Sequence, residues 1–183
     1  MVDRWKFKRT EACDHYRIFS VRKDFYTHPC IEEPTSFYVI ESPDWVNVVA
    51  TTAKDEILLI NQFRPGVKAV RLEIPGGVIE EDESPAEAAS RELLEETGYE
   101  GDPPKLICVT EPNPATHNNK CFSFLIENAT LKTKERNLDE KEIIDLKLMP
   151  YSKLSSLIRA GGLQHALLQV PLLHFMQNRE NKA

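Results

Sequence analysis

The segment between Ser84 and Gly98 carries signals for both ends of an α-helix. Ser84 and Glu87 form the Ser-x-x-Glu pattern of a capping box, and Pro85 suits the first helical position. Gly98 is the residue type that most often ends a helix. Apolar residues recur between these ends at offsets of three and four, so one face of the segment is apolar. The sequence therefore predicts a helix over 84–97 that packs this face on a core.

Runs of β-branched and aromatic residues on both sides of this helix predict strands. The runs cover 16–22, 36–42, 46–52 and 57–63 before the helix, and 105–111, 121–127 and 144–149 after it. Because the short segment 53–56 separates two apolar runs as a hairpin loop does, we expect the strands on either side of it to pair antiparallel. Further helices are expected near 152–160 and towards the C-terminus. This order predicts the α/β class, a sandwich in which helices cover a mixed sheet.

Composition limits the kinds of protein that this chain forms. With 183 residues, 41% of them hydrophobic, the chain fits one main domain over 44–183 with a β extension over 1–43. The net charge of −6 argues against nonspecific binding to nucleic acid. The first residues are polar and no apolar run approaches the ~20 residues that span a bilayer, so we expect a cytoplasmic protein without membrane contacts. The four cysteines form no Cys-x-x-Cys pair, which indicates neither a zinc site nor disulfides.

Acidic residues are concentrated around the predicted helix. Between residues 80 and 100 there are nine acids and one base, Arg91. On a helix Glu92 and Glu96 lie one turn apart with Glu95 beside them, and like charges at such spacings repel by roughly 0.2–0.5 kcal/mol per pair. Clustered carboxylates are the ligands that Mg²⁺ and Mn²⁺ prefer. The cluster therefore indicates a divalent-metal site, with a solvated acidic face as the alternative.

The run GVIEEDESPAEAASRELLEETGY, residues 77–99, resembles the Nudix box, with Tyr99 in the position of the final apolar residue. The positions that the box defines are Gly77, Glu83, Arg91, Glu92, Leu93, Glu95, Glu96, Gly98 and Tyr99. So many constraints at fixed offsets are far more specific than a lone glycine pattern. The resemblance implies the Nudix α/β/α sandwich and metal-dependent hydrolysis of a diphosphate bond.

The resemblance also assigns roles to individual residues. Carried over by position, Glu92 and Glu96 are the main metal ligands, and Glu95 is a further ligand or contacts a metal-held water. The carbonyl of Gly76 completes the ligand set, and Arg91 orients the carboxylates. Such ions polarise phosphoryl oxygens and lower the pKa of an attacking water, so no Ser or Cys nucleophile is required.

The run NQFRPGVKAVRLEIPGG, just before the box, resembles the ADP-ribose pyrophosphatases of this family. Arg64 is expected to reach the diphosphate, because guanidinium matches phosphate oxygens in a bidentate manner; the alternative is a surface arginine. Glu73 is expected to accept hydrogen bonds from ribose hydroxyls or to support the metal cluster. Arg71 falls on the same strand face as Glu73 and is a possible substrate contact.

Two polar segments after the box are further candidates. EPNPATHNNKCFSF places Asn113 and His117 where they line a pocket or form an inert turn, and its Pro114 is similar to a proline of the ADP-ribose hydrolases. The family branch also implies a late acidic loop that supplies the base for the attacking water. In LDEKEII Glu140 is the first choice and Glu142 the second, with a solvated charge run as the alternative.

The sequence thus predicts a Mg²⁺- or Mn²⁺-dependent hydrolase that splits ADP-ribose or a related nucleoside diphosphate sugar into a nucleoside monophosphate and a sugar phosphate. In the resembling branch an N-terminal extension such as 1–43 pairs across two subunits, so we expect a homodimer. One alternative is hydrolysis of a nucleoside triphosphate or a dinucleoside polyphosphate, because the box supports attack on any accessible diphosphate. Another is a sensor that binds a sugar nucleotide without turnover.

Overall fold

The computed structural model describes residues 2–138 and 142–181. The chain divides into two compact units. The first comprises residues 1–44 and 111–120, and the second comprises 45–110 and 121–183. Each unit is described by itself below. The segment 111–120, which the sequence places in the main domain, is grouped with the N-terminal strands.

The first unit is a three-stranded antiparallel meander in the order β1-β2-β3. Its elements are a 3-10 turn η1 (Val2–Arg4), β1 (Lys6–His15), β2 (Ser20–His28) and β3 (Ile31–Glu41). The strand expected over 16–22 is wrong in its first half, because Tyr16 donates its N–H to the carbonyl of Phe19 (2.8 Å) in the β1–β2 turn. A bridge between Ile40 and His117 joins the segment 111–120 to β3.

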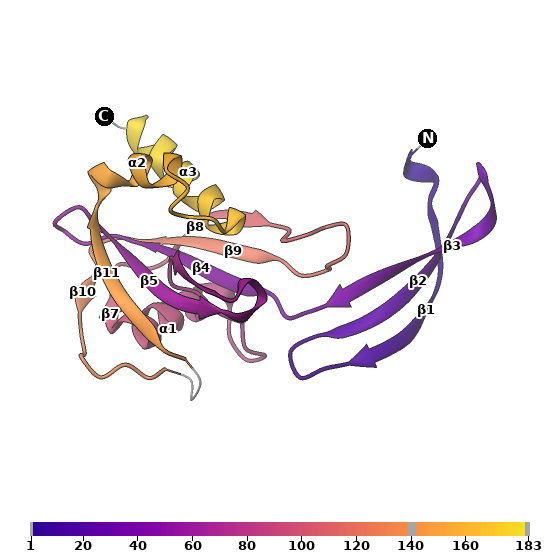
Figure 1. Cartoon of the computed structure of the whole chain (residues 1–183), viewed down its shortest axis with the longest axis horizontal. Coiled ribbons are helices and arrows are strands. Elements are labelled where there is room, and N and C mark those ends of the chain that lie inside the picture. Colours follow the sequence, from indigo (N-terminus) through magenta and orange to yellow (C-terminus); the bar gives the residue numbers. More distant parts are fainter. Residues whose placement is uncertain (1, 139–141, 182–183) are drawn as a thin grey trace. The chain divides into compact units, whose positions relative to one another are not determined.

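The second unit contains two three-stranded sheets and a two-stranded ribbon (Figure 1). The first sheet has the order β4-β9-β8, formed by β4 (Trp45–Ala50), β9 (Cys121–Ile126) and β8 (Lys105–Thr110). The second has the order β11-β5-β6, formed by β11 (Ile144–Pro150), β5 (Glu56–Arg64) and β6 (Ala69–Glu73), with the 3-10 turn η2 (Pro65–Val67) before β6. The ribbon pairs β7 (Tyr99–Glu100) with β10 (Thr130–Leu131). Because β4 and β9 are parallel and the other pairs are antiparallel, the arrangement is mixed.

The hairpin expected between 46–52 and 57–63 is only partly present. A turn exists, since Thr52 donates its N–H to the carbonyl of Glu56 (2.9 Å) and Asp55 has a positive φ of 59°. Beyond one bridge, between Thr51 and Ile57, the two strands part: β4 pairs with β9, and β5 pairs with β11 and β6. The expected antiparallel pairing is therefore wrong beyond this bridge, because each strand makes its ladder with a partner from elsewhere in the chain.

The helices of the second unit are α1 (Pro85–Thr97), α2 (Leu154–Arg159) after a 3-10 turn η3 (Tyr151–Lys153), and α3 (Ala166–Glu180). The capping box of α1 is confirmed: Ser84 Oγ accepts from the N–H of Glu87 (3.3 Å), and Glu87 Oε2 accepts from the N–H of Ser84 (2.8 Å). Gly98 ends this helix with a φ of 77°. No helix among the described residues is long and apolar enough to cross a membrane.

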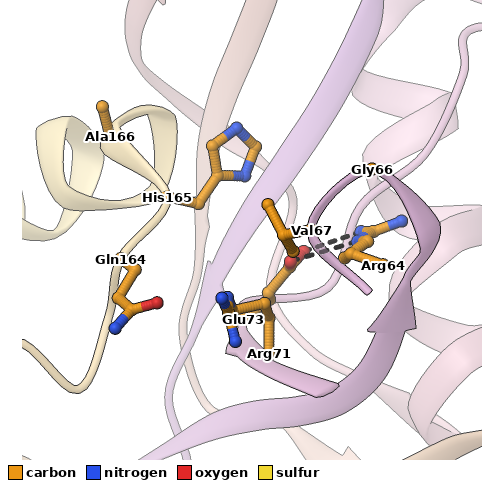
Figure 2. A pocket seen from close by; sticks show the side chains of 8 residues that line it. All are labelled: Arg64, Gly66, Val67, Arg71, Glu73, Gln164, His165 and Ala166. Carbon is orange, nitrogen blue, oxygen red and sulfur yellow. Dashed lines mark hydrogen bonds and ion pairs between the residues drawn. The ribbon is translucent and has the colours of Figure 1, made fainter. Parts of the chain in front are cut away.

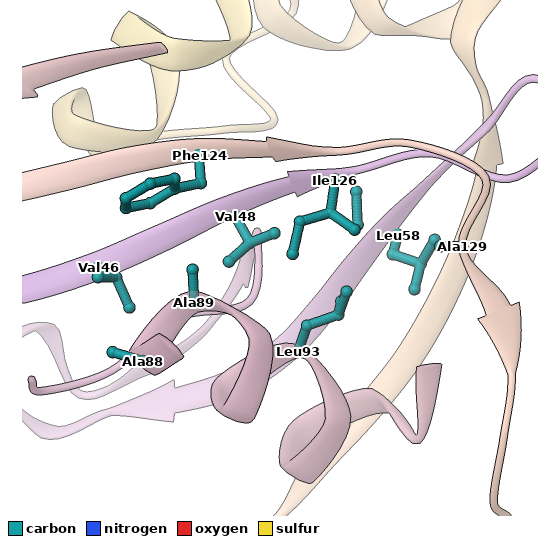
Figure 3. Packing of buried hydrophobic residues seen from close by; sticks show 10 residues of the cluster. Val46, Val48, Leu58, Ala88, Ala89, Leu93, Phe124, Ile126 and Ala129 are labelled. Atoms are coloured by element: carbon teal, nitrogen blue, oxygen red, sulfur yellow. The ribbon is translucent and has the colours of Figure 1, made fainter. Parts of the chain in front are cut away.

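The two faces of the strands supply two cores. Along β4, Val46 and Val48 pack with apolar residues of α1, as Figure 3 shows, and Ala50 belongs to the same cluster. Val49 packs with residues of α3. This alternation follows from the two-residue period of a strand. Helix α1 therefore covers one side of the strands, and α2 and α3 cover the other (Figure 1). The expected α/β sandwich is confirmed, and its first core fixes α1 against β4.

Candidate active site

A cavity of about 490 Å³ lies between two segments of the second unit (Figure 2). One wall is the β5–η2–β6 hairpin, and the other is the segment that leads into α3. The lining residues are Arg64, Gly66, Val67, Arg71 and Glu73 from the hairpin, with Gln164, His165 and Ala166 opposite them. The volume falls within the range of about 300–1,000 Å³ that is usual for small-molecule sites.

Arg64 and Glu73 form a bidentate ion pair in this cavity. Arg64 Nε lies 3.1 Å from Glu73 Oε1, and Arg64 Nη2 lies 2.6 Å from Glu73 Oε2. The pairing of β5 with β6 places Arg64 near Ala69 and Glu73 opposite Ile60, so both residues lie on adjacent strands of one sheet. Burial acts to lower the pKa of Arg64, but the hydrogen bonds and charge of Glu73 outweigh it and raise that pKa. Arg64 therefore remains a cation in the cavity.

Arg91 gathers three carboxylates around α1. Its Nη2 and Nε donate to Glu83 at 2.6 and 3.0 Å. Its Nη1 donates to Glu92 Oε1 (2.9 Å) and to Glu95 Oε2 (3.0 Å). Nη2 also reaches the carbonyl of Val78 (3.0 Å). The hydrogen bond from Arg91 lowers the pKa of Glu83, so this guanidinium favours the ionised form of that carboxylate.

Glu96 points to the inner side of the same helix, where its residue is only 2% exposed. Its Oε2 accepts from the N–H of Gly76 (2.8 Å). Burial raises the pKa of Glu96 to about 8, and the charges of Glu92 and Glu142 add to this effect. Burial likewise raises the pKa of Glu92. Two carboxylates are thus withdrawn from water with like charges close by, an arrangement that a bound cation would relieve.

Glu142 lies in the segment just before β11. Gln62 on β5 donates from Nε2 to Glu142 Oε1 (3.2 Å) and is itself only 8% exposed. The negative charge of Glu142 acts on both Glu92 and Glu96, and it also acts on Arg64. Glu142 therefore lies within electrostatic reach of the carboxylates and of the cavity. Glu140, the first choice as base, lies outside the described residues.

Two glycines permit the close packing of this site. The segment before α1 runs beside β4, since Val46 donates its N–H to the carbonyl of Gly77 and Val48 donates to that of Pro75, both at 2.8 Å. A Cβ atom on Gly76 would lie 2.3 Å from the carbonyl oxygen of Val46, and one on Gly77 would lie 2.1 Å from Glu92 Oε1. Only glycine fits at either position without displacing its neighbour.

The remaining candidate residues lie in both units of the chain. Arg71 lines the cavity beside Glu73. Asn113 and His117 belong to the first unit, where the carbonyl of Asn113 accepts from the N–H of His117 (2.8 Å) in a turn; the cavity and the carboxylates are built from the second unit. The sequence did not predict Gln164 or His165 as site residues, because nothing in the segment 161–166 indicates that it lies beside the β5–η2–β6 hairpin in the folded chain.

The chemistry of the donors fits a divalent cation. Glu92, Glu95 and Glu96 provide hard oxygen ligands, and the raised pKa values of Glu92 and Glu96 reflect negative charge that is poorly solvated. Within residues 2–138 and 142–181, no three His, Cys, Asp or Glu side chains already converge in the geometry of a metal site. Arg91 holds Oε1 of Glu92 and Oε2 of Glu95 through hydrogen bonds from Nη1.

Comparison with known proteins agrees with this geometry. The NUDIX domain profile matches residues 42–168, more than half of the chain. The chain belongs to the Nudix family. The family expected from residues 77–99 is thus confirmed.

Relatives and a solved structure extend the comparison. The chain is similar to an ADP-ribose pyrophosphatase of Bacillus subtilis, at 32% identity over 108 residues, which is 59% of this chain and 58% of that protein. It is also similar to a mouse ADP-sugar pyrophosphatase, at 43% identity over 49% of this chain and 38% of that protein. The matched segment thus spans little more than half of the Bacillus protein. A crystal structure of an ADP compounds hydrolase superposes with a TM-score of 0.87 at 19% identity, covering 99% of this chain and 97% of that one, which establishes the Nudix fold.

Proposed function

We propose that this protein hydrolyses the diphosphate bond of ADP-ribose or another nucleoside diphosphate sugar, using Mg²⁺ or Mn²⁺. The observation that carries the proposal is the position of Arg64. This residue lines the cavity in a bidentate pair with Glu73, and it lies within electrostatic reach of Glu96 and Glu142. A diphosphate beside Arg64 would therefore lie next to the carboxylates, with one end of the substrate in the cavity. The names of the Bacillus and mouse relatives support this substrate class.

The chain's own residues divide the work of the reaction. Arg64 binds and orients the diphosphate, as a guanidinium does when it meets phosphate oxygens in a fixed geometry. Glu92 and Glu96, with Glu95 and the carbonyl of Gly76, would hold the cation. When bound, the cation supplies Lewis-acid polarisation of the phosphoryl oxygens. Arg91 keeps the carboxylates in position through its bonds to Glu92 and Glu95.

Glu142 is the base in this proposal. It accepts a proton from the attacking water as the water oxygen bonds to one phosphorus, and the bridging P–O bond breaks to release a nucleoside monophosphate and a sugar phosphate. Two observations favour Glu142: the hydrogen bond from Gln62 holds its carboxylate, and its charge acts on both Glu92 and Glu96. Glu140 is the alternative, and Glu140→Gln tested beside Glu142→Gln decides between them.

The N-terminal meander is proposed to join two copies of the chain into a homodimer. Exposed aromatic residues support this, because Phe7, Phe37 and Tyr38 are 55%, 43% and 59% exposed in the single chain. Asn113 and His117, which belong to the same unit, are proposed as substrate contacts in that dimer. The molar mass in solution, measured by light scattering for the whole chain and for a chain that begins at Pro43, tests the assignment.

Release of nucleoside monophosphate tests the proposed reaction. The substrates are ADP-ribose, UDP-glucose, GDP-mannose, ATP and a dinucleoside polyphosphate, each with Mg²⁺, Mn²⁺ or EDTA. We expect turnover of the sugar nucleotides that EDTA abolishes. Cleavage of ATP or the dinucleoside polyphosphate alone would contradict the substrate class, and binding of sugar nucleotides without turnover would indicate a sensor.

A further inference from the structure

We propose that His165 binds hydroxyl groups of the sugar that is remote from the base in a nucleoside diphosphate sugar, and so contributes to substrate selection. The proposal rests on the proposed function. His165 belongs to the segment before α3, and its ring lines the cavity on the side opposite the Arg64–Glu73 pair (Figure 2). The ring is therefore in a position to contact a molecule that Arg64 holds from the other side.

The side chain of His165 is not used for helix capping. His165 is the N-cap residue of α3, a position where side chains usually accept a hydrogen bond from the first turn of the helix. It makes no such bond. Its ring lies instead against Trp45, with the ring centroids 5.8 Å apart and the planes 16° from parallel. Trp45 is the first residue of β4, so a residue of that strand orients the imidazole.

The polar groups around the cavity match a sugar better than a purely anionic ligand. Burial lowers the pKa of His165, so the imidazole is neutral at pH 7 and carries one N–H donor and one nitrogen acceptor. A sugar hydroxyl also donates and accepts. Arg64 and Arg71 provide donors on the opposite wall, and the carboxylate of Glu73 provides acceptors. Neighbouring hydroxyls thus find both kinds of partner on each wall.

The position of the cavity decides which part of the substrate it receives. Arg64 lines the cavity, and the charges of Glu96 and Glu142 act on it. A diphosphate that bridges Arg64 and the carboxylates therefore directs the group attached to it into the cavity. We assign this group to the sugar remote from the base. The nucleoside ribose is the competing occupant, and the experiment below separates the two.

The test combines a truncated ligand with substitutions of His165. Binding of ADP-ribose and of ADP is measured by isothermal titration calorimetry in EDTA, so that turnover does not interfere. ADP retains the base and its ribose but lacks the second sugar. We expect His165→Ala to weaken ADP-ribose binding about five- to tenfold, the loss of a hydrogen-bonding group, and to change ADP binding less than about twofold. His165→Asn, which keeps a donor and an acceptor, should recover part of the affinity.

His174→Ala is the matched control, because His174 is an exposed histidine on α3, the helix that follows His165. It should leave both affinities unchanged. If His165→Ala loses affinity equally for ADP-ribose and ADP, the assignment of the cavity to the sugar remote from the base is overturned. If it binds both ligands as tightly as the wild-type protein does, a contact between His165 and the ligand is overturned. The sugar assignment would also be overturned if the wild-type protein binds ADP-ribose no more tightly than ADP.

The same proteins distinguish failure of this inference from failure of the proposed function. If the wild-type protein prefers ADP-ribose through His165 but shows no turnover with Mg²⁺ or Mn²⁺, the proposed function fails and the sugar contact stands. If it hydrolyses ADP-ribose while His165→Ala leaves the ratio of the two affinities unchanged, the contact fails and the proposed function stands. Thermal unfolding of each variant checks that the fold is retained.

Discussion

Glu96→Gln is expected to stabilise the metal-free protein at alkaline pH while abolishing metal-dependent turnover. Because burial raises the pKa of Glu96 from 4.5 to about 8, the folded protein binds a proton that the unfolded chain releases at a much lower pH. The contribution of this group to stability is therefore fully present below about pH 4.5. It is lost as the pH rises through about 8. Glutamine has no such proton to lose and keeps an oxygen for the N–H of Gly76.

The size of the effect follows from the same shift. The interval between 4.5 and about 8 corresponds to an upper limit of ~5 kcal/mol in the free energy of unfolding. Water entry and local relaxation reduce this penalty in real proteins, so we expect ~2–3 kcal/mol between acidic and alkaline solution. At about pH 5 the wild-type protein and Glu96→Gln should have similar stability, and near pH 8 the variant should be the more stable by most of that amount.

Urea unfolding in EDTA, followed across the range from about pH 5 to pH 9, measures this difference. Glu81→Gln is the control, because Glu81 is an exposed acid in the turn before α1 and its replacement should not change the slope with pH. Parallel curves for the wild-type protein and Glu96→Gln would refute the argument, since they would mean that the carboxylate is well solvated. Turnover that persists in Glu96→Gln would separately refute its place in the cation site.

Other substitutions test the neighbouring contacts. Arg64→Ala leaves the carboxylate of Glu73, which is 3% exposed, without its partner. The free energy of unfolding measured with urea should fall by ~1–3 kcal/mol, a range that is discounted because Arg64 is partly exposed. Adding Glu73→Gln should recover part of this loss. Glu142→Gln should lower kcat by about 10²–10⁴-fold. Its binding of Mn²⁺, measured by electron paramagnetic resonance, should not weaken. A kcat equal to that of the wild-type protein would exclude Glu142 as the base. Gln62→Leu should lower kcat severalfold in the wild-type chain and have no further effect beside Glu142→Gln. Ser84→Ala should lower the stability in thermal unfolding by ~1 kcal/mol, because the cap of α1 is lost.

The parts of this protein that could be predicted from its sequence are those specified by interactions between residues close together in the chain. Helix α1 followed from Ser84, Glu87 and Gly98, whose capping contacts form within a few residues of one another. The carboxylates followed from fixed offsets on that helix. Because 3.6 residues make a turn, the spacing alone brings Glu92 beside Glu96. In the folded chain, the apolar face of this helix packs against β4.

Long-range pairing could not be predicted in the same way. The polar stretch 53–56 is a turn, but whether the strands beside it remain paired depends on β9 and β11, which lie far along the chain. His165 was missed for the same reason. Its neighbours in sequence indicate a helix start, whereas its contact with Trp45 and its place beside the Arg64–Glu73 pair arise from the tertiary fold.

The parallel pairing of β4 with β9 has a consequence for synthesis of the protein. Trp45 at one end of β4 pairs with Cys121, and α1 lies in the stretch of chain between them. A ribosome therefore releases the acid-rich helix before the strand that completes the sheet beneath it. Contacts between residues so far apart form slowly, because a long loop must close first. We expect nascent chains halted before β9 to leave α1 open to protease, with protection gained only once residues 121–126 have emerged.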